Sequence, residues 1–143
     1  MSTVVGIARS WIGTPYVHQA SVKGSGTDCL GLIRGVWREA LGEEPAVVPP
    51  YTADWFEPQR EERLWNAARS HLLAVLADRP YRPGEVLLFR MRDGSIAKHL
   101  GILSKTGTAS TFIHAYSGQG VLESSFSRPW QKRVVARFDY PIV

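Results

Sequence analysis

The stretch Gly26-Thr27-Asp28-Cys29-Leu30-Gly31-Leu32 decides the fold, because it places the only cysteine of the chain where a turn becomes a helix. A single cysteine cannot form a disulfide within the chain, so its value lies in packing or in thiol reactivity. The positive end of the helix macrodipole at a helix start favours the nucleophilic thiolate. Cys29 is therefore a candidate nucleophile, and the alternative is a small buried apolar residue, the commoner place of a free cysteine.

The sequence after the turn predicts a helix over residues 29–41, with Thr27 or Asp28 as its N-cap and Gly42 as its end. Apolar residues recur along one face of this helix, at Cys29, Leu32, Ile33, Val36 and Ala40. The thiol then lies at the end of the stripe that packs on the rest of the domain. A nucleophile that must meet a base on a sheet would lie there, and so would a core cysteine.

The other segments indicate two more helices and a set of strands, joined by loops and an extended connector. The predicted helices cover residues 3–12 and 58–77. An irregular stretch over residues 16–28 precedes the cysteine helix, and a proline-rich connector over residues 43–54 follows it. Five strands are predicted as a meander: 85–91, 97–104, 110–116, 121–126 and 132–139. His71 flanks the apolar face of the second of these helices, where a surface or packing role is expected.

Two histidines occur in neighbouring predicted strands, His99 in AKHLGILS and His114 in TFIHAY. A hairpin centred on Thr106-Gly107 would place them opposite each other, within side-chain reach. A slip of one residue would put them on opposite faces of the sheet, so the pairing register decides whether they meet.

Thiol hydrolysis of an amide needs a nucleophile, a base, a group that orients the base, and an oxyanion hole. We assign Cys29 as the nucleophile, with the helix dipole and a nearby imidazolium lowering its pKa, and its backbone N–H as an oxyanion donor. His99 is the candidate base and His114 the group that fixes its tautomer. Tyr16 is a candidate phenol donor or a loop-packing residue, and His18 lines the cleft or lies exposed on the loop.

Length and composition bound the remaining possibilities. A chain of 143 residues with 44% hydrophobic content predicts one globular domain, residues 1–143. The net charge of +4 comes from scattered basic residues, which favours a solvated face over a nucleic-acid interface.

Several kinds of site and segment are not expected. The sequence has no CxxC or HxxxH pair, so a zinc site formed by the cysteine and the histidines is disfavoured, and we expect no metal and no cofactor. The N-terminal residues do not resemble a secretory signal, and no stretch approaches the roughly 20 apolar residues of a membrane span.

Five short motifs occur in an order that resembles the NlpC-type cell-wall cysteine peptidases. They are residues 13–16, Gly-Thr-Pro-Tyr; 28–32, Asp-Cys-Leu-Gly-Leu; 83–86, Pro-Gly-Glu-Val; 99–102, His-Leu-Gly-Ile; and 113–115, Ile-His-Ala. Residues 11–39 further resemble the phage-type branch of this family, which is found in tail modules and gene transfer agents.

The resemblance implies a compact papain-like α+β fold, with the cysteine on a helix packed against an antiparallel sheet. It implies a peptidoglycan hydrolase that cleaves stem peptides, usually between D-glutamate and the diamino acid. Nucleophile, base and orienting group map onto Cys29, His99 and His114. It also implies phage-like tail proteins as partners, with synthesis in the cytoplasm and action at the periplasm or cell wall as part of a phage-like particle.

Three departures from the family pattern bear on specificity. In related enzymes, the serine after the cysteine and the aspartate before it help to bind the free amine of the stem peptide. This chain has the aspartate, Asp28, but has Leu30 in place of the serine. Val17-His18-Gln19 replaces an aromatic and glycine pattern at the rim of the cleft, and Glu85 stands where aspartate is usual. The chain shows no appended wall-binding module, so we expect targeting by a carrier particle or by the catalytic domain.

Two alternative functions remain open at this stage. An amidase or acyltransferase could use the same three residues, because they fix the chemistry of acyl transfer and not the acyl donor. A tail-tip structural protein on a peptidase fold is a different class of function, and the presence of Cys29, His99 and His114 argues against it.

Overall fold

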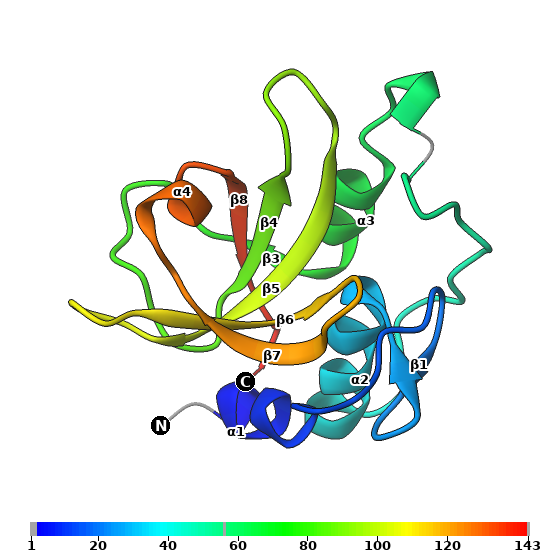
Figure 1. Ribbon diagram of the computed structural model, residues 1–143, viewed down its shortest axis with the longest axis horizontal. Helices are drawn as coiled ribbons and strands as arrows, with labels where there is room; N and C mark the ends of the chain where they lie inside the picture. The colour runs from blue at the N-terminus through cyan, green and yellow to red at the C-terminus, as the bar shows by residue number, and fades with distance from the viewer. Residues whose placement is uncertain (1–2, 56, 143) are drawn as a thin grey trace.

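The computed structural model describes residues 3–55 and 57–142, so residues 1–2, 56 and 143 of the predicted domain lie outside the described part. Three helices, α1 (Thr3–Ser10), α2 (Cys29–Leu41) and α3 (Arg63–His71), pack with one face of an antiparallel six-stranded sheet. Figure 1 shows α1 and α2 below the sheet and α3 beside β5. The structure is therefore the α+β arrangement of helices on a sheet that the sequence predicts.

The sheet has the strand order β3-β8-β4-β5-β6-β7. Its strands are β3 (Leu73–Ala74), β4 (Val86–Arg90), β5 (Ala97–Lys105), β6 (Thr111–Tyr116), β7 (Gly120–Ser125) and β8 (Val134–Asp139), and a separate two-stranded ribbon joins β1 (Ser21–Val22) to β2 (Gly26–Thr27). The five predicted strands are present, but they do not form one meander, because β8 returns to pair with β4 instead of β7. The short α4 (Arg128–Gln131) makes that return possible by carrying the chain back from β7.

The helix predicted over 58–77 is wrong at both ends. Residues Glu57–Gln59 form a short 3-10 helix, and α3 begins only at Arg63. At the other end Leu73 pairs with Asp139 of β8, and Leu76 is 78% exposed, so neither leucine belongs to a helical apolar face. Pairing of β3 with β8, which would otherwise be an unpaired edge of the sheet, outweighs the helical spacing of the leucines.

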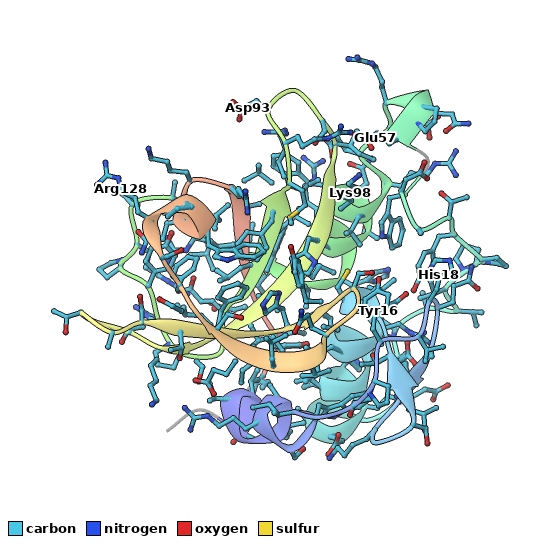
Figure 2. All side chains as sticks on the ribbon, in the orientation of Figure 1. Tyr16, His18, Glu57, Asp93, Lys98 and Arg128 are labelled. Carbon is cyan, nitrogen blue, oxygen red and sulfur yellow. The ribbon has the colours of Figure 1, made fainter. Side chains whose placement is uncertain are left out.

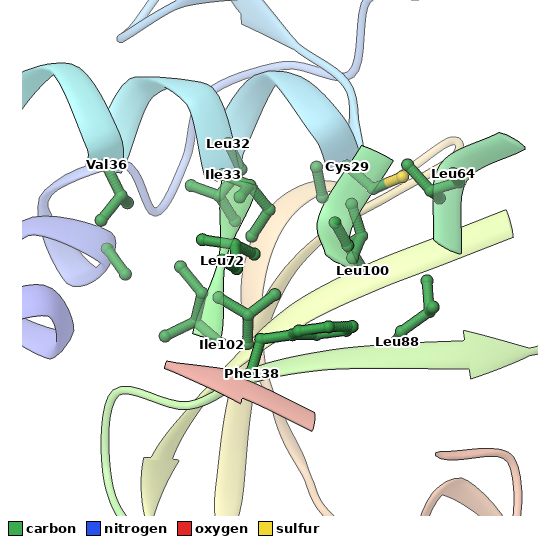
Figure 3. Close-up of a cluster of buried hydrophobic side chains, with 14 of the residues drawn as sticks. Cys29, Leu32, Ile33, Val36, Leu64, Leu72, Leu88, Leu100, Ile102 and Phe138 are labelled. Carbon is green, nitrogen blue, oxygen red and sulfur yellow. The ribbon is translucent and has the colours of Figure 1, made fainter. Parts of the chain in front are cut away.

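Apolar side chains form two clusters, one on each face of the sheet. The larger cluster joins the helices to the sheet, and Figure 3 shows Cys29, Leu32 and Val36 of α2 above Leu100 and Ile102 of β5. The smaller cluster lies on the other face and contains Leu87, Phe89, Leu103, Phe112 and Phe126, with Trp130 of α4 packed against it. The catalytic candidates thus lie at the boundary between two packed layers.

A buried ion-pair network fixes the start of β4. The carboxylate of Glu85 is fully buried and accepts hydrogen bonds from Arg137 at 2.7 and 2.9 Å and from Arg79 at 2.9 Å. Its Oε2 also accepts the backbone N–H of Arg82 at 2.8 Å. Glu85 therefore ties the turn before β4 to β8, since a buried carboxylate requires this degree of pairing.

Candidate active site

The loop before α2 is held by the side chain of Asp28. Asp28 has extended backbone angles, and its Oδ1 accepts the N–H of Gly31 at 2.7 Å, which is the N-cap geometry. Its Oδ2 accepts the N–H of Gln19 at 2.7 Å and the hydroxyl of Tyr51. Asp28 is thus the N-cap, one of the two candidates predicted from the sequence, and the residue is only 2% exposed.

Gly31 in the first turn of α2 allows the loop to pass close to the helix. A Cβ atom at this position would lie 2.0 Å from the carbonyl oxygen of Ala20 and 2.4 Å from Oγ1 of Thr27. No side chain fits at those distances, so the glycine of the Asp-Cys-Leu-Gly motif is required by contact with the loop. The same contact fixes where Cys29 begins the helix.

Cys29 is buried, and its thiol donates to the carbonyl oxygen of Lys98 with an S···O distance of 3.9 Å. Burial, with the negative charge of Asp28 in addition, raises the pKa of the Cys29 thiol to about 12. The backbone N–H groups of Leu100, Leu30 and Cys29 itself act in the lowering direction but do not offset burial. The sequence predicts a lowered pKa from the helix dipole, and the structure shows that desolvation outweighs it in the free protein.

His99 on β5 and His114 on β6 form a hydrogen-bonded pair, with Nε2 of His99 2.8 Å from Nδ1 of His114. The strands pair Ile102 with Ile113 and Leu103 with Phe112, and continuing this register places Gly101 opposite His114. The two histidines are therefore diagonal neighbours on one face rather than directly opposite. A Cβ at Gly101 would lie 3.4 Å from Cβ of His114 and 2.8 Å from the ring of Phe112, so glycine leaves the room that the pair occupies.

Ser124 on β7 extends this hydrogen-bonded row, because its Oγ lies 2.9 Å from Nε2 of His114. His99, His114 and Ser124 thus come from three consecutive strands. His114 uses both of its ring nitrogens within the row, and His99 uses Nε2, so Nδ1 of His99 is the nitrogen left for a partner outside the row.

An aromatic cage surrounds the two imidazole rings. Trp130 lies 5.9 Å from the ring of His99 and 5.3 Å from that of His114, and Phe112 lies 4.2 Å from His114. Burial lowers the pKa of His99 to about 3, with the neighbouring His114 contributing, and burial lowers the pKa of His114 to about 4. Both histidines are neutral at pH 7, so the free protein holds a neutral thiol and a neutral imidazole.

Cys29 and His99 share a cavity of about 160 Å³ with all three predicted binding residues, Tyr16, His18 and Asp28. Figure 2 shows Tyr16 and His18 on the loop that precedes α2, and Lys98 on β5. Burial, then the charges of Cys29 and Asp28, raise the pKa of Tyr16 to about 12, which keeps its phenol a hydrogen-bond donor. The assigned roles of these residues stay predictions.

His18 and Asp28 are engaged with the connector after α2 in this structure. Nε2 of His18 lies 2.9 Å from the carbonyl oxygen of Tyr51, and Nε2 of Gln19 donates to the same oxygen at 2.6 Å. The ring of Tyr51 stacks on Trp55 at 4.2 Å and 10°. Tyr51 and Trp55 therefore form one wall of the cavity that holds Cys29 and His99, which we call the catalytic cavity. Hydrogen bonds from His18 and Gln19 to Tyr51 join this wall to the loop before α2.

Five residues of the site are absent from the sequence prediction: Tyr51, Trp55, Lys98, Ser124 and Trp130. Tyr51 lies in the segment 43–54, which was interpreted as a plain connector, and Trp55 follows directly after it. Lys98 precedes the base and forms an ion pair with Glu57 at 2.8 Å. No local pattern marks Ser124 or Trp130, because their contacts depend on strand pairing and on the turn of α4.

Among residues 3–55 and 57–142, no group of three or more histidine, cysteine, aspartate or glutamate side chains could hold a metal ion. Within the same part of the chain, the helices are all too short or too polar to cross a membrane.

A thiol at a helix start and an imidazole pair on the adjoining sheet define the class of papain-like thiol hydrolase folds. The sequence model of the NlpC/P60 family matches residues 13–138. The chain belongs to the NlpC/P60 family, which confirms the family predicted from its motifs.

Two relatives are enzymes by name. The chain is 29% identical over 139 residues to a gamma-DL-glutamyl hydrolase of Bacillus subtilis, covering 95% of this chain and 29% of that protein. It is 32% identical over 124 residues to the murein DD-endopeptidase MepS/murein LD-carboxypeptidase of Escherichia coli K12, covering 86% of this chain and 54% of that protein. The chain thus spans about half or less of the length of these relatives, whose names fit the predicted class of enzyme.

A solved structure, NlpC1 from Trichomonas vaginalis, superposes on 96% of this chain and 42% of its own, with a TM-score of 0.65 and 20% identity. This similarity confirms the predicted papain-like α+β fold.

Proposed function

We propose that this domain is a cysteine endopeptidase of peptidoglycan that cleaves stem peptides, between D-glutamate and the diamino acid, with Cys29, His99 and His114 as its catalytic residues. The observation that carries the proposal is the 2.8 Å hydrogen bond between His99 and His114, on the cavity that also holds Cys29. The names of the relatives support murein as the polymer, and the glutamyl hydrolase supports a glutamyl bond.

The hydrogen-bonded row assigns a direction to proton transfer. For Nδ1 of His99 to accept the thiol proton, Nε2 of His99 carries the hydrogen that it donates to Nδ1 of His114. His114 then donates its own Nε2–H to Oγ of Ser124. The imidazolium that forms on His99 is therefore stabilised by a neutral acceptor whose tautomer is fixed.

The acyl transfer follows from these positions. The sulfur of Cys29 attacks the peptide carbonyl carbon, and the N–H of Cys29 at the start of α2 donates to the oxyanion that develops. His99 returns the proton to the leaving amine, a thioester remains on Cys29, and water hydrolyses it by the same route. Because the thiol and imidazole of the free protein are neutral, the proton passes from Cys29 to His99 as the sulfur attacks.

Mass spectrometry of purified peptidoglycan fragments, incubated with the protein and with Cys29→Ala, tests the proposal. We expect cleavage by the parent alone, with product masses that place the cut after D-glutamate. Cleavage at another amide would overturn the bond assignment, and equal cleavage by the variant would overturn the nucleophile.

We also propose that the protein works at the cell wall as part of a phage-like tail. The support is the resemblance of residues 11–39 to the phage-type branch of the family. Immunoblotting of density-purified tail particles from the producing cells would detect the protein in the particle fraction, and its recovery only in the soluble fraction would exclude this proposal.

One observation favours a second candidate, a tail structural domain with little turnover. Burial keeps both Cys29 and His99 neutral, and a structural domain does not need the thiolate that a hydrolase uses as its nucleophile. Absence of cleavage by a folded parent protein in the same mass-spectrometric experiment would favour this candidate.

A further inference from the structure

A second cavity, of about 370 Å³, lies between α2, residues 44–51 and α3. We call it the apolar cavity, because aliphatic and aromatic side chains form most of its lining. They include Leu30, Ile33, Trp37, Leu64, Ala67 and Leu72. Its volume is within the range of ligand sites, and it is more than twice that of the catalytic cavity.

Three of the charged groups that line the apolar cavity are already paired, and Arg63 among them forms an ion pair with Glu61 at 2.8 Å. Arg34 and Glu44 both line it, and Nε of Arg34 donates to Oε1 of Glu44 at 2.7 Å. Arg38 adds a second hydrogen bond to the same carboxylate at 2.9 Å. Because an unpaired charge is costly to bury, the part of a ligand that enters this cavity is apolar and uncharged.

The apolar cavity adjoins the catalytic residues. Leu30 follows Cys29 in the chain and Leu100 follows His99, and both leucines line the apolar cavity. In Figure 3 the sulfur of Cys29 points from the first turn of α2 toward Leu64, another lining residue. The apolar cavity therefore borders the segments that carry Cys29 and His99.

The two cavities share a wall formed by Tyr51 and Trp55. Trp55 has a φ of 55°, a left-handed conformation that is a genuine outlier for a bulky side chain. Strain of this kind persists where the surrounding structure imposes it, and it clusters at functional sites. The ring of Tyr51 stacks on Trp55 and holds the indole between the two cavities. A ligand that occupies both cavities would therefore pass over this indole.

We propose that the apolar cavity is a substrate subsite, which takes an aliphatic group carried by the acyl donor that Cys29 attacks. This inference rests on the proposed function, because it assumes that Cys29 is the nucleophile. An alanine methyl group would leave most of 370 Å³ empty, so the preferred group is a longer aliphatic chain. The site then accepts acyl donors beyond unmodified stem peptides.

A series of p-nitrophenyl esters, from acetate through butanoate and hexanoate to octanoate, tests the subsite. In each reaction the sulfur of Cys29 forms a thioester with the acyl carbon, the ester C–O bond breaks, and p-nitrophenolate leaves with the thiol proton released through His99. The rate is divided by that of glutathione with the same ester, which removes intrinsic reactivity. We expect a gain of up to about fourfold per methylene, and of at least about tenfold from acetate to octanoate.

Two variants on α3 locate the effect. Ala67→Trp fills the apolar cavity from its exposed side and should lower the octanoate-to-acetate ratio at least fivefold, by the same methylene scale. Ser70→Trp adds the same side chain one turn away, outside the lining, and should retain the ratio of the parent. Ala67→Leu is the milder filling variant, in case the tryptophan prevents folding.

The outcomes separate the two proposals. Equal normalised rates for all four esters, or a chain-length preference that survives both filling variants, would overturn the apolar subsite and leave the nucleophile intact. Failure of a folded parent to form any thioester at Cys29 would instead overturn the nucleophile, and the subsite with it.

Discussion

His99 and His114 lie diagonally across two antiparallel strands, with Nε2 of one ring 2.8 Å from Nδ1 of the other. The pair shares one proton along this bond, and His114 in turn is bound at 2.9 Å by Ser124. Because the row is enclosed by Phe112 and Trp130, its protonation is coupled to folding as well as to catalysis.

We expect the stability of the protein to fall as the pH is lowered from about 6.5 to 5. The folded-state pKa values of His99 and His114, about 3 and 4, lie below the ordinary value, so in this window the unfolded chain takes up protons that the folded chain does not. Each histidine contributes a slope of up to about 1.4 kcal/mol per pH unit. Urea unfolding at pH 7.5, 6.0 and 5.0 measures this slope.

His114→Gln removes one of the two titrating groups and should reduce the slope by up to about 1.4 kcal/mol per pH unit. His71→Gln, on the exposed side of α3, is the control for loss of a histidine elsewhere. A free energy of unfolding that stays constant between pH 7.5 and 5.0 would contradict the buried neutral pair.

Asp28→Asn should make Cys29 more reactive. The charge of Asp28 adds to burial in raising the pKa of the thiol, and asparagine keeps the N-cap hydrogen bond while removing the charge. The pH profile of alkylation by iodoacetamide should shift to lower pH, with a gain of about tenfold in rate for each unit by which the pKa falls.

Asp78→Asn makes the same change of charge at an exposed position and should leave the alkylation profile where it is. Asp28→Ala should in addition cost about 1 kcal/mol of stability, because it also removes the cap. An unchanged alkylation profile in Asp28→Asn would show that the aspartate does not act on the thiol through its charge.

The sequence was sufficient for elements whose signals are local. Helix α2 begins at Cys29 and ends at Leu41 as predicted, because Asp28 caps its first turn and the backbone N–H of Gly42 bonds the carbonyl of Arg38 at its end. The position of Cys29 at a helix start and of His99 and His114 in neighbouring strands was likewise predicted from the residues and their order.

The rest depends on contacts between distant parts of the chain. The pairing of Lys105 with Thr111 centres the hairpin beyond Thr106-Gly107, so the two histidines are not directly opposite. The irregularity between Leu103 and Lys105 then shifts the register by one residue and brings both histidines to the same face as diagonal neighbours. The hydrogen bond from Tyr51 to Asp28 joins residues that are far apart in the sequence, and no periodicity encodes it. Burial of the thiol is also a tertiary property, so the local helix dipole predicted the wrong direction for its pKa.

Trp130→Leu should raise the pKa values of both histidines. Its ring closes the cage at 5.9 Å from His99 and 5.3 Å from His114, and a smaller side chain admits water that favours the charged imidazoles. Nuclear magnetic resonance titration of the histidine ring protons would follow the shift toward the ordinary value of about 6.5.

Arg133→Leu is the matched control for Trp130→Leu. The guanidinium of Arg133 lies 5.2 Å from the centre of the Trp130 ring, so its removal alters the neighbourhood of the indole and leaves the cage in place. Histidine titrations that are identical in the parent and in Trp130→Leu would show that the indole does not exclude water from the pair.

Ser124→Ala should lower kcat by about fivefold with little effect on KM, because it removes a hydrogen bond worth about 1 kcal/mol that fixes the tautomer of His114. Ser124 acts through His114 and so has no contact with substrate to lose. Ser125→Ala removes the neighbouring hydroxyl, which is exposed at the end of β7, and should leave kcat unchanged. Ser124→Thr retains a hydroxyl and should recover most of the rate. A fall in kcat in Ser125→Ala as large as that in Ser124→Ala would mean that β7 is disturbed as a strand, and the positioning role of Ser124 would have to be abandoned.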